Sequence, residues 1–94
     1  MAILGFADKE TEKIFHEQFS RKLPHDIQAT ALRKLIYIYN ALSLNDLRVP
    51  PGNRLEQLHG DREGQYSIRI NEQFRICFTV HTNGFDDLEI TDYH

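Results

Sequence analysis

The sequence predicts an α+β fold, with two N-terminal helices packed on one face of a small, twisted, mainly antiparallel sheet. Apolar residues recur at helical spacing in the N-terminal half. In the C-terminal half they alternate with polar residues, as they do in half-buried strands. A chain of 94 residues is too short for two separate cores, so we expect a single domain over residues 1–94.

The first elements expected are a short edge strand and an amphipathic helix. Residues 2–6 form an apolar run of strand length. Asp8 is a suitable N-cap. Apolar side chains then repeat at helical spacing over about residues 8–20, which predicts the first helix.

A second, longer helix is expected over about residues 24–43. Pro24 suits the first position of a helix, where its missing N–H is not needed. An apolar stripe follows at the spacing of one helix face: Ile27, Ala31, Leu35, Ile38 and Leu42. Residues 43–49 favour one further helical turn before the double proline stops it.

The centre of the predicted sheet is a hairpin. Residues 66–70 and 74–80 both alternate apolar and polar side chains, and only residues 71–73 separate them. Their apolar side chains share one face, and their polar side chains, arginines included, share the other. We expect the chemistry of the protein on this polar face.

Further strands are expected on both sides of the hairpin. Residues 54–58 predict a strand, and residues 59–64 a turn with glycine at both flanks. An Asn-Gly turn at residues 83–84 leads to a last strand over residues 88–93.

Composition excludes several classes of protein. The chain is 40% hydrophobic and 27% charged, which is ordinary for a globular protein. No apolar run approaches the ~20 residues of a membrane span, and the N-terminus lacks the basic region of a signal peptide. The single cysteine, Cys77, fits a reducing compartment, so we expect a cytoplasmic protein with no membrane partner.

The sequence predicts neither a metal site nor a cofactor. It has no CxxC motif and no spaced pair of histidines for zinc. It has neither a GxGxxG nor a Walker motif for a nucleotide. Side chains alone are therefore expected to carry any chemistry.

The distribution of positive charge is more informative than the net charge of −3. From residue 48 onward every strong base is an arginine: Arg48, Arg54, Arg62, Arg69 and Arg75. The guanidinium group presents a rigid fork of donors that suits phosphate. The competing interpretation is a solvated face, on which these arginines pair with neighbouring acidic residues: Glu56, Asp61, Glu63 and Glu72.

The chain ends in three groups that can transfer protons, Asp92, Tyr93 and His94. RNA cleavage by a 2′-hydroxyl needs a base, an acid and cations that stabilise the pentavalent phosphorane, and it needs no metal. Arginines on the neighbouring strands would supply the cations. The competing interpretation is a frayed terminus without a role.

A family resemblance carries these observations further. The stretches PPGNRLEQL, GDREGQYSIRIN and FRICF, with the terminal DYH, resemble the HigB branch of the RelE/ParE toxin superfamily. The resemblance implies a RelE-like fold and a small cytoplasmic toxin of a type II toxin–antitoxin system, acting as a ribosome-dependent mRNA endoribonuclease. It also implies two kinds of partner: a helix-turn-helix antitoxin (HigA-like), and the ribosome with its mRNA.

The resemblance also implies roles for particular residues. Asp92, Tyr93 and His94 match the terminal catalytic motif of the family. Arg75 matches the arginine that holds the scissile phosphate. On the other matched stretches, the residues expected to bind phosphate or ribosomal RNA are Arg54, His59, Arg62 and Arg69.

One departure from the family pattern affects the expected catalytic base. Where many relatives carry a catalytic histidine after leucine, this chain has Glu56, and its nearest histidine is His59. Either Glu56 or Asp92 would then serve as the base, with His94 as the acid. Two other functions compete with RNA cleavage: a ParE-like inhibitor of DNA gyrase without chemistry of its own, and a degenerate toxin that only binds its antitoxin.

Overall fold

The structure of the protein, a computed structural model, describes residues 2–92 and confirms the expected α+β class. The helices and strands are β1 (Ala2–Ile3), α1 (Lys9–Phe15), α2 (Gln28–Asn40), β2 (Glu56–Gln57), β3 (Gln65–Arg69), β4 (Phe74–His81) and β5 (Gly84–Asp92). Short 3-10 segments connect them: η1 (His25–Ile27), η2 (Leu44–Arg48), η3 (Pro51–Asn53) and η4 (Gly60–Arg62). No helix within residues 2–92 is long and apolar enough to cross a membrane.

The strands form one mixed sheet in the order β1-β5-β4-β3-β2. The pairs β2–β3, β3–β4 and β4–β5 are antiparallel, whereas β1 pairs with β5 in parallel. The expected hairpin is confirmed, because β3 pairs with β4 in a register that places Tyr66 opposite Phe78 and Ile68 opposite Ile76. The last strand is longer than expected and begins at Gly84.

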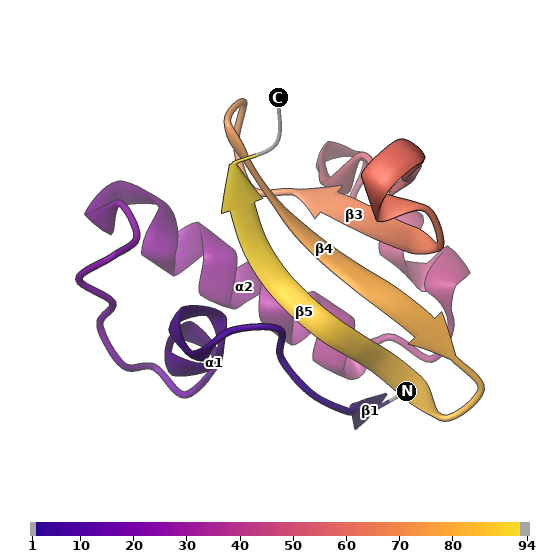
Figure 1. The fold of residues 1–94 in the computed structure, drawn as a ribbon, viewed down its shortest axis with the longest axis horizontal. Coiled ribbons are helices and arrows are strands. Elements are labelled where there is room, and N and C mark those ends of the chain that lie inside the picture. The colour runs from indigo at the N-terminus through magenta and orange to yellow at the C-terminus, as the bar shows by residue number, and fades with distance from the viewer. Residues whose placement is uncertain (1, 93–94) are drawn as a thin grey trace.

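Helix α2 lies behind the sheet in Figure 1 and packs on its apolar face. Ala31, Leu35 and Ile38 are fully buried in a core that they share with the apolar side chains of β3, β4 and β5. The expectation that Leu42 continues this stripe is wrong, because α2 ends at Asn40 and Leu42 is 81% exposed. The adjacent Ala41 is buried in the core instead.

Helix α1 is shorter than expected, and its placement corrects the expectation that both helices cover one face. Asp8 is confirmed as its cap, since its Oδ1 accepts from the Thr11 N–H at 3.0 Å. α1 lies beside α2 and reaches the outer edge of β5, where the Thr11 hydroxyl accepts from the Ile90 N–H at 2.9 Å. β1 is too short to pair with this part of β5, so the helix satisfies a strand donor that would otherwise be buried without a partner.

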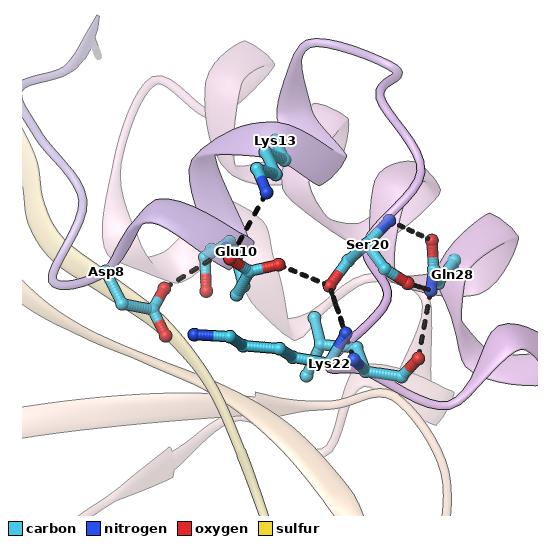
Figure 2. Close-up of polar contacts among 8 residues, drawn as sticks. Asp8, Glu10, Lys13, Ser20, Lys22 and Gln28 are labelled. Atoms are coloured by element: carbon cyan, nitrogen blue, oxygen red, sulfur yellow. Dashed lines mark hydrogen bonds and ion pairs between the residues drawn. The ribbon is translucent and has the colours of Figure 1, made fainter.

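The connector between the helices is held by polar contacts around the buried Ser20 (Figure 2). The Ser20 hydroxyl donates to Glu10 at 2.6 Å and accepts from the N–H groups of Lys22 and Leu23. The side-chain amide of Gln28 accepts from the Ser20 N–H through Oε1 at 3.1 Å and donates to the Ser20 carbonyl through Nε2 at 2.7 Å. The hydrogen bond from Ser20 lowers the pKa of the Glu10 carboxyl. This network orients α1 against α2, together with the buried Ile14 and the contact between the rings of Phe15 on α1 and Tyr39 on α2.

Candidate functional site

An open groove of about 440 Å³ lies at the end of the sheet where β3 turns into β4. Its lining combines the last cross-strand pair of the hairpin, the turn itself and the start of β2: Arg54, Glu56, Arg69, Asn71, Glu72 and Arg75. Three arginines face two glutamates in this set, so the lining carries a net positive charge. Such a groove suits an anionic ligand of the size of a nucleotide segment.

Strand register explains why residues distant in sequence meet here. Arg69 on β3 lies directly opposite Arg75 on β4. Glu56 on β2 lies opposite Ser67, one alternation away from Arg69 on the same face. The structure thus brings together four of the residues singled out from the sequence, Arg54 among them.

Arg75 is on the expected polar face of the sheet, but at Arg75 this face is buried, unlike the solvated face of the competing interpretation. Arg75 is 9% exposed, and its neighbours Ser67 and Cys77 are fully buried. Its Nε donates to Ser67 Oγ at 2.7 Å, and its Nη2 donates to the Arg54 carbonyl at 2.6 Å. The chain around η3 and η4 covers this face, and in Figure 1 the short helix before β3 lies in front of the sheet.

The two other arginines of the groove make no ion pair within residues 2–92. Arg54 is exposed and Arg69 half-buried. The ion pairs of the described chain join Lys13 to Glu10, His59 to Glu63 and Arg62 to Glu89. The competing interpretation, in which Arg54 and Arg69 pair with neighbouring carboxylates, is therefore wrong for both. Like charges directly opposite each other destabilise a sheet, so the Arg69–Arg75 pair favours a site for a bound anion.

Arg62 and His59 lie outside the groove. Arg62 lies on η4. Its Nη1 donates to Gln65 on β3 at 3.0 Å and to Glu89 on β5 at 3.1 Å, on the same face of the sheet as Arg75. His59 is exposed in the preceding loop and lies 3.3 Å from the Glu63 carboxylate. Cys77 is buried beneath this region, and burial raises the pKa of its thiol, which disfavours the reactive thiolate.

Asp92 ends β5 at the groove end of the sheet but is not part of the groove lining. It pairs with Phe74, so alternation places its side chain on the face opposite to that of Arg75. Its Oδ2 accepts from Gln73 Nε2 at 2.8 Å, which joins the end of β5 to the hairpin turn. Tyr93 and His94, the other two members of the terminal motif, lie outside the described residues.

Sequence reasoning gave no site role to Ser67 or Asn71, and it considered Glu72 only as an ion-pair partner of an arginine. Ser67 was assigned to the polar face without a role, although the three-residue connection of the hairpin already places it diagonal to Arg75. Asn71 accepts from the N–H groups of Gln73 and Phe74, and so shapes the turn that closes the groove. A register drawn from the turn length would have identified these contacts.

Replacing Arg75 with lysine is expected to lower stability as well as to remove the fork. An ammonium group does not reach both Ser67 Oγ and the Arg54 carbonyl, so at least one buried acceptor loses its donor. We expect the free energy of unfolding to fall by roughly 1–3 kcal/mol, measured by urea denaturation. The matched control is Arg21→Lys, an exposed arginine on the helix connector. Equal stability of the two variants would show that the Arg75 contacts do not hold the groove.

Comparison with known proteins agrees with the fold and with the motifs. The sequence model of the HigB-like toxins, described as RelE-like toxins of the type II toxin–antitoxin system HigB, matches residues 4–94. Toxin HigB-1 of Vibrio cholerae serotype O1 is 41% identical over 76 residues, which cover 80% of each chain. An uncharacterized protein of Haemophilus influenzae is 37% identical over 67 residues, covering 71% of this chain and 66% of that protein.

Solved structures show similarity of fold. Two structures of the YoeB–YefM toxin–antitoxin complex from Staphylococcus aureus align with TM-scores of 0.58 and 0.56. Each is 21% identical in sequence and covers 100% of this chain and 97% of the matched chain. The family match over nearly the whole sequence and the 41% identity to Toxin HigB-1 establish that the chain belongs to the HigB-like family of RelE-like toxins of type II toxin–antitoxin systems.

Proposed function

We propose that this toxin is a metal-independent endoribonuclease that cleaves mRNA on the translating ribosome. The observation that carries the proposal is the groove, in which Arg54 and Arg69 have no carboxylate partner within residues 2–92, beside the fixed guanidinium of Arg75. A cluster of cations beside a carboxylate, at the end of a rigid sheet, matches what transesterification of RNA requires.

The arginines act on the phosphate. Arg75 is held by the protein in one orientation, so it needs no reorganisation when charge develops on the phosphorane oxygens. Arg69, on the opposite strand, and Arg54, at the rim, contribute positive charge to the same region. Arg62 and His59 lie further along the protein surface and contact flanking RNA.

Proton transfer completes the reaction. A base takes the proton of the 2′-hydroxyl, the 2′ oxygen attacks phosphorus, the bond to the 5′ oxygen breaks, and an acid protonates that leaving oxygen. Glu56 lines the groove and Asp92 does not, which favours Glu56 as the base over Asp92. Tyr93 and His94 follow the end of β5, and we assign the acid to His94, with Tyr93 stacking on a base or assisting the proton transfer.

The ribosome enters the proposal because the groove alone is a poor RNA-binding site. The groove is open, and the net charge of −3 gives little long-range attraction for RNA. An mRNA held in the ribosome is already positioned, which removes the entropic cost of orienting it. Control by a HigA-like helix-turn-helix antitoxin in the cytoplasm completes the proposal; the antitoxin would block either the groove or entry to the ribosome.

Cleavage is expected only in translated mRNA. In a reconstituted translation reaction the toxin should cut mRNA within codons, whereas the same RNA without ribosomes should remain intact, because only the ribosome orients it. Primer extension on both samples measures the products. Comparable cleavage of naked RNA would contradict ribosome dependence. Intact mRNA in both samples, with DNA gyrase inhibited in a supercoiling assay, would support the ParE-like alternative.

Removal of Tyr93 and His94 is expected to separate activity from stability. A chain that ends at Asp92 should keep its melting temperature, since terminal residues rarely contribute much to a core. Cleavage in the translation reaction should fall on the order of a hundredfold, the usual contribution of general acid–base catalysis. Full cleavage by the truncated chain would reject both residues as catalytic and transfer their role to Glu56, His59 and Asp92.

A further inference from the structure

The structure contains a buried lysine that the proposed chemistry does not use. Lys34 lies on α2 and is 6% exposed. Its Nζ donates to Asn53 Oδ1 at 2.6 Å and lies 5.9 Å from the ring centre of Tyr37, and within residues 2–92 it forms no ion pair. Burial lowers the pKa of this amine, and the charges of Arg33, Arg69 and Arg75 lower it further. An apolar side chain would fill the same space without burying a charge.

Asn53, the partner of Lys34, has both atoms of its side-chain amide held by hydrogen bonds. Asn53 is fully buried, and its Nδ2 donates to the carbonyls of Leu47 and Val49 at 3.1 and 3.2 Å. Lysine offers only donors and the two carbonyls offer only acceptors, so a single orientation of the amide satisfies all three contacts. Lys34 therefore ties α2 to the end of the η3 segment through one side chain.

The residue that follows Asn53 has an unusual backbone conformation. Arg54 has φ 44° and ψ 57°, in the left-handed region that residues with a side chain rarely adopt. This conformation directs the Arg54 carbonyl at Arg75 Nη2, 2.6 Å away, while the Arg54 side chain lines the groove. Strained backbone of this kind persists only where its surroundings fix it, and the buried Asn53 provides that fixed point.

We propose that Lys34 and Asn53 are positioning residues, which hold Arg54 in its left-handed conformation and thereby fix the Arg75 guanidinium in the groove. The contacts form one continuous chain from α2 to the groove: Lys34, Asn53, the Arg54 carbonyl and Arg75. Neither Lys34 nor Asn53 lines the groove itself. Without this anchor Arg54 relaxes to an ordinary backbone conformation and its carbonyl turns away. The fork then loses that acceptor and keeps, of the contacts described above within residues 2–92, the bond to Ser67.

The first test reads the guanidinium directly and does not depend on the proposed function. In ¹⁵N–¹H NMR spectra of the full chain, the Nε proton of Arg75 should exchange slowly with water, because it donates to Ser67 in a buried site. Lys34→Met keeps the length and apolar packing of the side chain but removes the amine. It should accelerate exchange of this proton roughly tenfold or more. The amide signals of β3, β4 and β5 should stay in place, and Lys9→Met, at an exposed lysine of α1, should change neither.

The second test isolates the backbone conformation of Arg54. Glycine adopts the left-handed region freely and valine does not, yet both substitutions remove the Arg54 side chain. Arg54→Gly should therefore keep exchange of the Arg75 Nε proton slow, and Arg54→Val should accelerate it. Equal exchange in the two variants would overturn the role of the backbone conformation.

A further variant, at Asn53, keeps the inference testable if Lys34→Met does not fold. Asn53→Asp keeps an acceptor for Lys34 but loses the donors to Leu47 and Val49, and it should also release Arg75. The inference is overturned if both variants fold with wild-type exchange of the Arg75 Nε proton. It is also overturned if neither variant folds, since the pair would then support the whole fold rather than position one side chain.

The activity measurement rests on the proposed function and separates the two claims. Lys34→Met should lower the single-turnover rate of mRNA cleavage on the ribosome roughly tenfold to a hundredfold, with little change in the concentration that gives half-saturation. A reduced rate with unchanged NMR exchange would assign the loss to another cause. If the wild-type chain cleaves no mRNA, the proposed function fails, and the NMR measurements still decide the positioning role.

Discussion

The groove depends on the hydrogen bonds of one buried guanidinium group. Arg75 donates to Ser67 on the neighbouring strand and to the Arg54 carbonyl on the chain that covers the sheet. These bonds join β4, β3 and the segment after η3 at one point, and they keep a positive charge in a nearly dry environment. Interactions of a charge with a developing negative charge are strong in such an environment, and they require no rearrangement.

The rest of the fold supplies what this interaction needs. The sheet provides two rigid strands, and α2 buries their apolar face. The Ser20 network and the Thr11 bond to Ile90 hold α1 against α2 and the edge of β5, so that little of the small sheet is left without support. The apolar core that stabilises the fold and the arginines of the groove therefore lie on opposite faces of the same strands. This division allows a chain of 94 residues to combine a packed core with an arginine-lined groove.

Much of this arrangement was predictable, because hydrophobic periodicity reflects burial directly. The alternation on β3 and β4 and the stripe on α2 led to the α+β class, the hairpin and the core. The placement of α1 was not predictable, since it depends on how far β1 pairs along β5. The end of α2 was placed beyond Asn40 because Leu42 extends the apolar stripe, although tertiary packing selects Ala41 instead.

The residues of the site could be predicted from the sequence, but the burial of the sheet face that carries Arg75 could not. Sequence motifs singled out Arg54, Glu56, Arg69 and Arg75, and register brings them into one groove. Alternation alone cannot show that a polar face is covered, because the cover comes from loops whose path depends on Asn53 and on the left-handed Arg54. For the same reason the sequence gives no sign that the amine of Lys34 is buried in the fold.

The central claim is that the groove cuts translated mRNA, and mapping of RNA 5′ ends in cells tests it most directly. Brief induction of the wild-type chain should produce new 5′ ends inside translated coding sequences, and few in untranslated RNA. Induction of an Arg69→Ala variant should produce far fewer, because that arginine lines the groove and has no carboxylate partner within residues 2–92 to be left unpaired. An Arg21→Ala control should match the wild type. An unchanged 5′-end profile after induction of the wild type, or equal cleavage by the Arg69 variant, would contradict the claim.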